Sequence, residues 1–393
     1  MSIMLSGLNA ANNELSVISN NIANSSTTGY RGARAEFSAV YNGNKGNGVQ
    51  FVGASQNFDK NGILSDTGRT LDVGISGQGF FMVKDTSGSN LYTRSGIFNV
   101  DSNGNLVNNL GHVVQGYTTD NNNLLQTGNV DAISISSASI PAKATNTVNF
   151  VANLDANESE IDPLITPFDI TDPNSYSHSY TTTVYDSLGN ANTVTQYFVK
   201  RDTATNEWDV NSIVNGDIAT LSTNTVTFDA QGQIDPAAAN YVVTVAGAPI
   251  NMSLNNSSQY SSNFSVSQND ADGFTAGQYT GVRIENDGSV YAQYTNGQSQ
   301  LQGQIILANF TNTQELLKTT GTAWSETAAS GAAIIGKPGE GIYGNLNSGT
   351  LENSNVDLTE EMVSLMNAKR NYQANSQALS AREELLTTLF NAV

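Results

Sequence analysis

Cysteine is absent from the 393-residue chain, and only two histidines, His112 and His178, are present. The lack of cysteine excludes disulfides, thiolate catalysis and thiolate metal sites. Neither histidine has a partner at metal-ligand spacing, so both are expected to be ordinary core or surface residues. The sequence therefore predicts no catalytic residue, no metal site and no cofactor, and we expect a protein that is not an enzyme.

Basic residues are also scarce, with 16 Lys and Arg against 35 Asp and Glu and a formal net charge of −19. Phosphate backbones and anionic lipids repel such a chain, so we expect no nucleic-acid partner and no membrane insertion. Residues 144–199 contain acidic residues but no Lys or Arg. We interpret this run as a solvated acidic surface. A calcium loop is the alternative, but the run lacks the alternating Asp, Asn and Gly ligands of such loops.

Long apolar runs are missing too. No window approaches the roughly 18 apolar residues of a membrane-spanning helix. The N-terminus has no basic residue before Arg31 and no continuous apolar stretch, so it does not match a cleaved signal peptide. The remaining possibilities are cytosolic residence or export by a route without a cleaved signal.

Two glycine-rich segments approach nucleotide-binding motifs without completing them. Residues 331–338 (GAAIIGKP) match a phosphate loop until Pro338, which replaces the hydroxyl residue that would hold magnesium. Residues 339–344 (GEGIYG) match G-x-G-x-x-G, but a loop-like composition follows instead of a helix. We therefore interpret both as glycine-rich connections of a β domain.

The first residues carry a heptad pattern typical of a helix that packs against another helix. Between residues 2 and 24, the apolar positions are separated by alternating steps of four and three. The polar run 24–29 (NSSTTG) then ends the helix. The residues predicted to form this seam are Met4, Leu8, Ala11, Leu15, Ile18 and Ile22.

A second seam lies at the C-terminus. Asp357 is the predicted N-cap of its helix, and Glu360 is three residues further on as a capping-box partner. The seam weakens over residues 369–375, where only Tyr372 is large. The seven-residue repeat comprises Leu358, Leu365, Tyr372, Leu379, Leu386 and Val393, and it is flanked by Met362, Ala368, Leu389 and Phe390.

The region between the two ends is rich in alternating β-type segments. Asn103-Gly104 and Asp287-Gly288 each lie between two short segments of this kind and predict type I′ hairpins. Residues 181–199 predict two strands joined at 188–190. The predicted fold is mixed and mainly β. Terminal α-helices form a coiled-coil pair, and an outer β-rich domain is inserted into an inner one.

Changes in composition near residue 144 and over 268–281 set the predicted domain boundaries. A terminal helical polymerisation domain with an extended linker would comprise residues 1–70 and 351–393. The inner β domain would comprise 71–144 and 282–350, and the outer inserted domain 145–281.

The two terminal helices are the features that favour polymerisation. One helix against one partner buries too few apolar side chains to offset the conformational entropy lost on ordering. We therefore expect termini that are disordered in the monomer and fold when they join several neighbours. The residues alone leave open an alternative, in which the helices form an intramolecular hairpin that caps one domain.

Several stretches together resemble the rod and hook axial proteins of the bacterial flagellum. At the N-terminus these are LSGLNAA (5–11), ISNNIAN (18–24) and TTGYR (27–31). Further along they are LDVGISGQGFF (71–81), YTRSG (92–96), IILANF (305–310), GTLENSNVDL (349–358) and RNYQAN (370–375). The insert, with YDSLGN (185–190), and the segment AEFSAVY (35–41) are similar to the hook members, since rod members are shorter. The sequence departs from the usual family pattern in two places. Thr313 and Gln314 stand where the family usually has Pro and Gly, and the segment 41–49 is shorter than in many hook members.

The resemblance implies a structural subunit that assembles with itself, as a helical homopolymer, into the flexible hook that links the basal-body rod to the filament. It further implies rod, hook-cap and hook–filament junction proteins and the flagellar export apparatus as partners, and an extracellular location reached without signal cleavage. The helices would then line the inner wall of the tube. A distal rod subunit of the same family is the alternative. An extracellular β-rich adhesin and a glycosidase are more remote.

Overall fold

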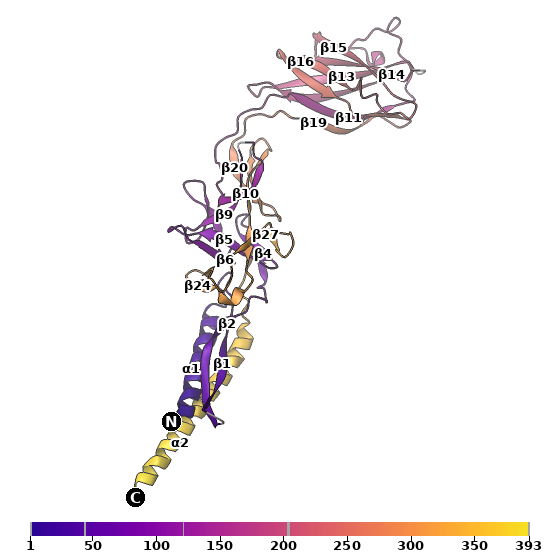
Figure 1. Ribbon diagram of the computed structural model, residues 1–393. Helices are drawn as coiled ribbons and strands as arrows, with labels where there is room; N and C mark the ends of the chain where they lie inside the picture. The colour runs from indigo at the N-terminus through magenta and orange to yellow at the C-terminus, as the bar shows by residue number, and fades with distance from the viewer. Residues whose placement is uncertain (1, 43–44, 121, 203–204, 392–393) are drawn as a thin grey trace. The chain divides into compact units, whose positions relative to one another are not determined.

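The computed structural model describes the whole chain except residues 1, 43–44, 121, 203–204 and 392–393, so the predicted seam residue Val393 lies outside the described residues. Two long helices, α1 (Ser2–Ala23) and α2 (Leu358–Asn391), stand at the two ends of a chain that is otherwise mainly β (Figure 1). This confirms the predicted fold class. One compact unit comprises residues 1–137, 280–293 and 299–393, and the other comprises 138–279 and 294–298. The three-domain division and its nesting stay predictions.

The helices of the first unit begin and end where local chemistry dictates. The carboxylate of Asp357 accepts hydrogen bonds from the backbone N–H of Thr359 at 2.8 Å and of Glu360 at 3.3 Å, so it caps α2 as predicted. Helix α1 ends at Ala23, before the polar run 24–29. A long antiparallel hairpin of β1 (Ala33–Asn42) and β2 (Lys45–Gln56) follows and packs against α1.

A 13-stranded sheet forms most of the rest of this unit. Its main path runs through β20 (Tyr279–Ile284), β21 (Ser289–Tyr294), β22 (Ser299–Ile305), β9 (Val113–Thr119), β5 (Phe80–Lys84), β6 (Asn90–Thr93), β25 (Ala323–Ser325) and β24 (Leu317–Thr319). Off this path lie β7 (Phe98–Val100), β8 (Leu106–Asn108), β10 (Leu125–Ala132), β23 (Leu307–Asn309) and β26 (Ile334–Gly336). The 3-10 turn η2 (Thr313–Glu315) lies between β23 and β24.

Two small antiparallel pairs join distant parts of the chain near α2. Strand β3 (Leu64–Asp66) pairs with β28 (Thr350–Glu352), and β4 (Val73–Ser76) pairs with β27 (Asn345–Ser348). These two pairings fix the segment before α2 on the β structure. The same unit contains an aromatic cluster in which Phe58 lies edge-on to Phe80 and to Trp324.

The second unit contains two sheets around one apolar core. One sheet has the order β12 (His178–Tyr185), β13 (Ala191–Asp202), β14 (Glu207–Val214) and β15 (Asp217–Thr227). The other has β16 (Asn240–Val245), β17 (Ala248–Ser253), β11 (Thr147–Asp155) and β18 (Ser258–Tyr260), with β19 (Ser265–Ala271) also paired to β11. A 3-10 turn, η1 (Pro173–Ser175), precedes β12. The pairing of β12 with β13 confirms the two strands predicted over 181–199.

The predicted hairpins are present, but their turn type is different. Gly104 and Gly288 have positive φ, whereas Asn103 and Asp287 do not, so neither turn is type I′. In each, the glycine N–H donates to a carbonyl three residues earlier, as in a type I turn followed by a glycine. In the first turn the Asp101 carboxylate also accepts from the backbone N–H of Asn103 and Asn105, which stabilises the longer loop.

The two near-motif segments behave as glycine-rich connections. Residues 331–344, all of them described, form strand β26 and turns, and the following residues form β27. No helix start within residues 331–350 could therefore receive a phosphate group.

Candidate functional site

The two terminal helices pack side by side in opposite directions. Gly7 near the start of α1 lies beside Asn375 of α2, and Asn21 near the end of α1 donates to Glu361 at 2.8 Å. Because α2 is the longer helix, its last turns extend beyond the first residue of α1 (Figure 1). The sequence predicted that these helices pair, and the structure brings them together within the chain.

The predicted seam residues of α1 are partly covered. Ala11 and Ile18 are buried, and Met4, Leu8, Leu15 and Ile22 are half-buried. Helix α1 contacts both α2 and the β1–β2 hairpin, and the hydroxyl of Ser6 accepts from the backbone N–H of Val49 at 3.2 Å. The hairpin therefore covers part of α1 at Ser6, which is not one of the predicted seam residues.

The predicted seam of α2 is mostly uncovered. Ala368 is fully buried and Leu365 and Leu379 are half-buried. In contrast, the last turns expose their apolar side chains, with Leu389 64% and Phe390 80% exposed. The other predicted residues that remain exposed are Leu358, Met362, Tyr372 and Leu386. One chain thus supplies a partner for only part of this helix.

The two helices approach closely at a glycine. A β-carbon on Gly7 would lie 2.8 Å from Oδ1 of Asn375, at the end of that side chain, so an alanine there would require the amide to shift. Asn375 belongs to the stretch 369–375 in which the predicted seam weakens. The absence of large apolar residues there therefore matches a place where small and polar groups meet.

Asn21 connects the two helices to the start of the hairpin. Its side chain is 2% exposed. Its Nδ2 donates to the Ala33 carbonyl at 2.7 Å and to Oε1 of Glu361 at 2.8 Å, and its Oδ1 accepts from the Ala33 N–H at 2.9 Å. Glu361 is thereby half-buried against α1. Burial raises the pKa of Glu361, Asn21 opposes this by hydrogen bonding to the carboxylate, and Glu360 adds to the rise.

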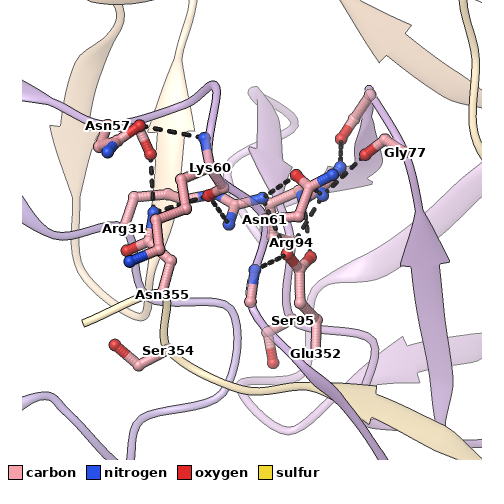
Figure 2. A network of polar contacts seen from close by, with 12 residues as sticks. Arg31, Asn57, Lys60, Asn61, Gly77, Arg94, Ser95, Glu352, Ser354 and Asn355 are labelled. Atoms are coloured by element: carbon pink, nitrogen blue, oxygen red, sulfur yellow. Dashed lines mark hydrogen bonds and ion pairs between the residues drawn. The ribbon is translucent and has the colours of Figure 1, made fainter. Parts of the chain in front are cut away.

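A buried ion cluster lies where the helix-bearing segments join the β structure (Figure 2). Glu352 is fully buried between Arg31 and Arg94, which are each 2% exposed. The carboxylate lies 2.9 Å from Nη2 of Arg31 and 2.8 Å from Nε of Arg94. Burial, and then the neighbouring charge of Arg94, lowers the pKa of Arg31 to about 10. Burial likewise lowers the pKa of Arg94.

The loop 57–62 closes the cluster (Figure 2). Oδ1 of Asn61 accepts from Nη2 of both arginines, at 3.1 Å from Arg31 and 2.9 Å from Arg94. The Lys60 carbonyl accepts from Nη1 of Arg31 at 3.0 Å and from the amide of Asn355 at 2.8 Å. The cluster therefore joins the chain after α1, the loop 57–62, the residue that follows strand β6 and the segment before α2.

The cluster is not among the sites predicted from the sequence. Arg31, Arg94 and Glu352 belong to TTGYR, YTRSG and GTLENSNVDL, three of the stretches that carry the flagellar resemblance. The presence of oppositely charged residues in these separate stretches was the one sequence feature that could have indicated a buried ion cluster. No sequence feature of this kind indicated that Asn61 belongs to it.

A polar groove of about 640 Å³ runs between α1, the base of the hairpin and the first turns of α2. Glu14, Arg34, Lys60 and Glu360 are among its lining residues. A groove of this composition suits polar contacts with another chain better than it suits a small apolar ligand. The described part of the chain holds no cluster of three or more His, Asp or Glu residues suited to a metal ion. Neither helix, over its described residues, is long and apolar enough to cross a membrane.

Models of flagellar protein families match successive parts of the chain. They are described as flagella basal body rod protein (residues 1–31), flagellar hook protein FlgE/F/G D1 domain (74–151), flagellar basal body protein FlaE D2 domain (153–274) and flagellar basal body rod FlgEFG protein C-terminal (347–392).

Proteins named flagellar hook protein FlgE match over nearly the whole length. The protein from Salmonella typhimurium is 39% identical over 400 residues, covering 98% of this chain and 98% of the relative. The protein from Escherichia coli K12 is 40% identical with the same coverage. The protein from Brucella suis is 30% identical and covers 98% of this chain and 97% of the relative.

The fold is also similar to that of the Helicobacter pylori flagellar hook protein FlgE2. That crystal structure has a TM-score of 0.58 and 14% identity, and the match covers 74% of this chain and 100% of the other. The family resemblance inferred from the sequence is confirmed, and the match along the full length of hook proteins favours the hook over the shorter rod subunits. The chain belongs to the flagellar hook protein family.

Proposed function

We propose that the chain assembles with itself into the tube of the flagellar hook, and that its terminal helices supply the contacts between copies that hold the tube together. The exposed apolar side chains on the last turns of α2 carry this proposal. Leu385, Leu389 and Phe390 are each more than 60% exposed, on turns that extend beyond the partner helix. Burying them against neighbouring copies would gain roughly 1.5–3 kcal/mol for each side chain.

The remaining assignments follow from membership of the family. The terminal domain (1–70 and 351–393) would polymerise, and the inner β domain (71–144 and 282–350) would surround it. The outer domain (145–281) would contact outer domains of neighbouring copies through hydrated polar surfaces. The tube would act as a universal joint between rod and filament. Its further partners would be rod, hook-cap and hook–filament junction proteins and the flagellar export apparatus. The subunit would reach its extracellular location without signal cleavage, and it would have a structural role rather than an enzymatic one.

A pair of matched variants tests the role of α2. Leu389→Ala/Phe390→Ala removes two exposed apolar side chains from the last turns of the helix. Leu164→Ala/Ile165→Ala removes two that are 92% and 80% exposed in the second unit. Electron microscopy and sedimentation of the purified chain should show tubes for the second variant and a strong loss of tubes for the first. Tubes formed equally well by both variants would contradict the proposal.

A further inference from the structure

Asn61 lies in an environment that is chemically unusual for an asparagine. It is followed by Gly62, and an Asn-Gly bond is the one in which the following backbone nitrogen is least shielded. The oxygen of its amide accepts from two guanidinium groups, those of Arg31 and Arg94, at 3.1 and 2.9 Å. Two cationic donors on one carbonyl oxygen draw electron density from the carbonyl carbon and would stabilise negative charge on that oxygen.

The backbone nitrogen of Gly62 has an equally specific partner. Its N–H donates to Oε1 of Glu352 at 2.8 Å, which is within the range for a general base to accept a proton. A β-carbon at position 62 would lie 1.8 Å from the Asn353 carbonyl oxygen, so packing admits only glycine. A polarised amide, a nitrogen nucleophile and a carboxylate base are therefore held together by the fold.

We propose that Asn61 is a self-modification site at which the folded protein converts its own asparagine into an aspartyl residue. The Gly62 nitrogen bonds to Cγ of Asn61, and its proton passes to the Glu352 carboxylate. The two arginines stabilise the negative oxygen that forms. The Cγ–Nδ2 bond then breaks, and the nitrogen leaves as ammonia with the proton that Glu352 returns. Water opens the resulting succinimide to aspartate or isoaspartate, so the net change is the addition of water and the loss of ammonia.

The charge balance of the cluster favours the product. Two guanidinium ions face a single carboxylate in a buried site, so one positive charge is unbalanced. A carboxylate at position 61 would face the same two arginines and neutralise the cluster. Burial of unbalanced charge is costly, so the modified cluster should hold the helix-bearing segments on the β structure more firmly. Asn61 is itself exposed, which gives water access for the last step.

The test compares the full-length chain folded and unfolded. Peptide mass spectrometry follows the replacement of amide nitrogen by oxygen, and isoaspartate-specific methylation detects the second product. Asn103-Gly104 is the internal control, because its glycine N–H donates to a backbone carbonyl instead of a carboxylate. We expect Asn61 to react at least about tenfold faster in the folded chain than in urea, whereas Asn103 reacts no faster when folded.

Two variants complete the test. Glu352→Gln removes the base and should slow the reaction of Asn61 in any fraction that folds. Asn61→Asp builds one product directly and should raise the melting temperature above that of freshly prepared, unmodified protein. The comparison of folded and unfolded wild type needs no variant. A folded chain in which Asn61 reacts no faster than in urea overturns the proposal.

Discussion

Gly7 and Asn375 face each other across the two terminal helices, at a point where a β-carbon on Gly7 would lie 2.8 Å from the Asn375 amide oxygen. An added β-carbon would therefore push this amide aside. The Gly7–Asn375 contact lies where the apolar seam of α2 weakens. The packing of small and polar groups, rather than burial of apolar side chains, therefore governs the pairing of the helices there.

Gly7→Ala is expected to weaken the pairing of α1 with α2. Alanine favours an isolated helix by about 1 kcal/mol over glycine, so a loss of assembly would come from the collision with Asn375 and not from reduced helix propensity. Critical concentrations for tube formation measure the effect. Gly7→Ala/Asn375→Ala removes the colliding amide and should restore assembly. If the single variant assembles as well as the wild type, the close approach is unimportant.

Asn21→Ala should destabilise the helix-bearing part of the first unit. The change leaves the half-buried Ala33 N–H and carbonyl without their side-chain partner, which costs about 1–3 kcal/mol. Chemical denaturation gives the change in free energy of unfolding. Asn20→Ala is the matched control, since Asn20 is exposed and bonds only within its own helix. Equal losses in the two variants would contradict the role assigned to Asn21.

The pairing of the helices should weaken as the pH rises through the acidic range. Burial raises the pKa of Glu361 above its usual 4.5, so the folded state binds this proton more tightly than the unfolded state does. The stabilisation that protonated Glu361 contributes is fully present below pH 4.5, and it is lost as the pH rises through the higher pKa that Glu361 has in the folded state. Glu361→Gln keeps an acceptor for Asn21 and should remove this part of the pH dependence. Parallel pH profiles for variant and wild type would refute the assignment.

Glu352→Ala is expected to cost about 3–5 kcal/mol, because it leaves Arg31 and Arg94 buried without a counter-ion. The exposed pair of Arg34 and Glu36 supplies the control, and Glu36→Gln should change the free energy of unfolding far less. Thermal and chemical unfolding of both variants make the comparison. A small loss for Glu352→Ala would mean that the cluster does not hold the segments together.

The last turns of α2 should exchange their amide hydrogens rapidly in the monomer and slowly in tubes. They have no helical partner among the residues that the structure describes, and an isolated helix end of this length is marginal in water. Hydrogen exchange with mass spectrometry compares the two states. The hairpin β1–β2, which is paired within the chain, is expected to change much less. Equal protection of residues 381–391 in monomer and tube would contradict folding on assembly.

The helices could be predicted from the sequence because their heptad periodicity is local. The N-cap at Asp357 followed from the same local pattern, and the strands over 181–199 followed from β-type residues around a glycine turn. The turn types could not be predicted from the Asn-Gly and Asp-Gly pairs alone, because in the first turn Asp101 favours a longer loop through its own hydrogen bonds to the backbone. The face of α1 that the hairpin covers could not be predicted from local periodicity either.

The buried cluster could not be predicted in this way, because Arg31, Asn61, Arg94 and Glu352 come from four distant segments. Only the fold brings their side chains together, although three of them belong to stretches that resemble the family. The contact between Asn21 and Glu361 could not be predicted either, because it joins two residues that are 340 positions apart in the sequence.

A helical reconstruction of the assembled tube by electron microscopy tests the central claim most directly. The account predicts that Leu386, Leu389 and Phe390 of each copy are covered by helices of neighbouring copies. Tubes in which these side chains face solvent, while the β units make all contacts between copies, would contradict it.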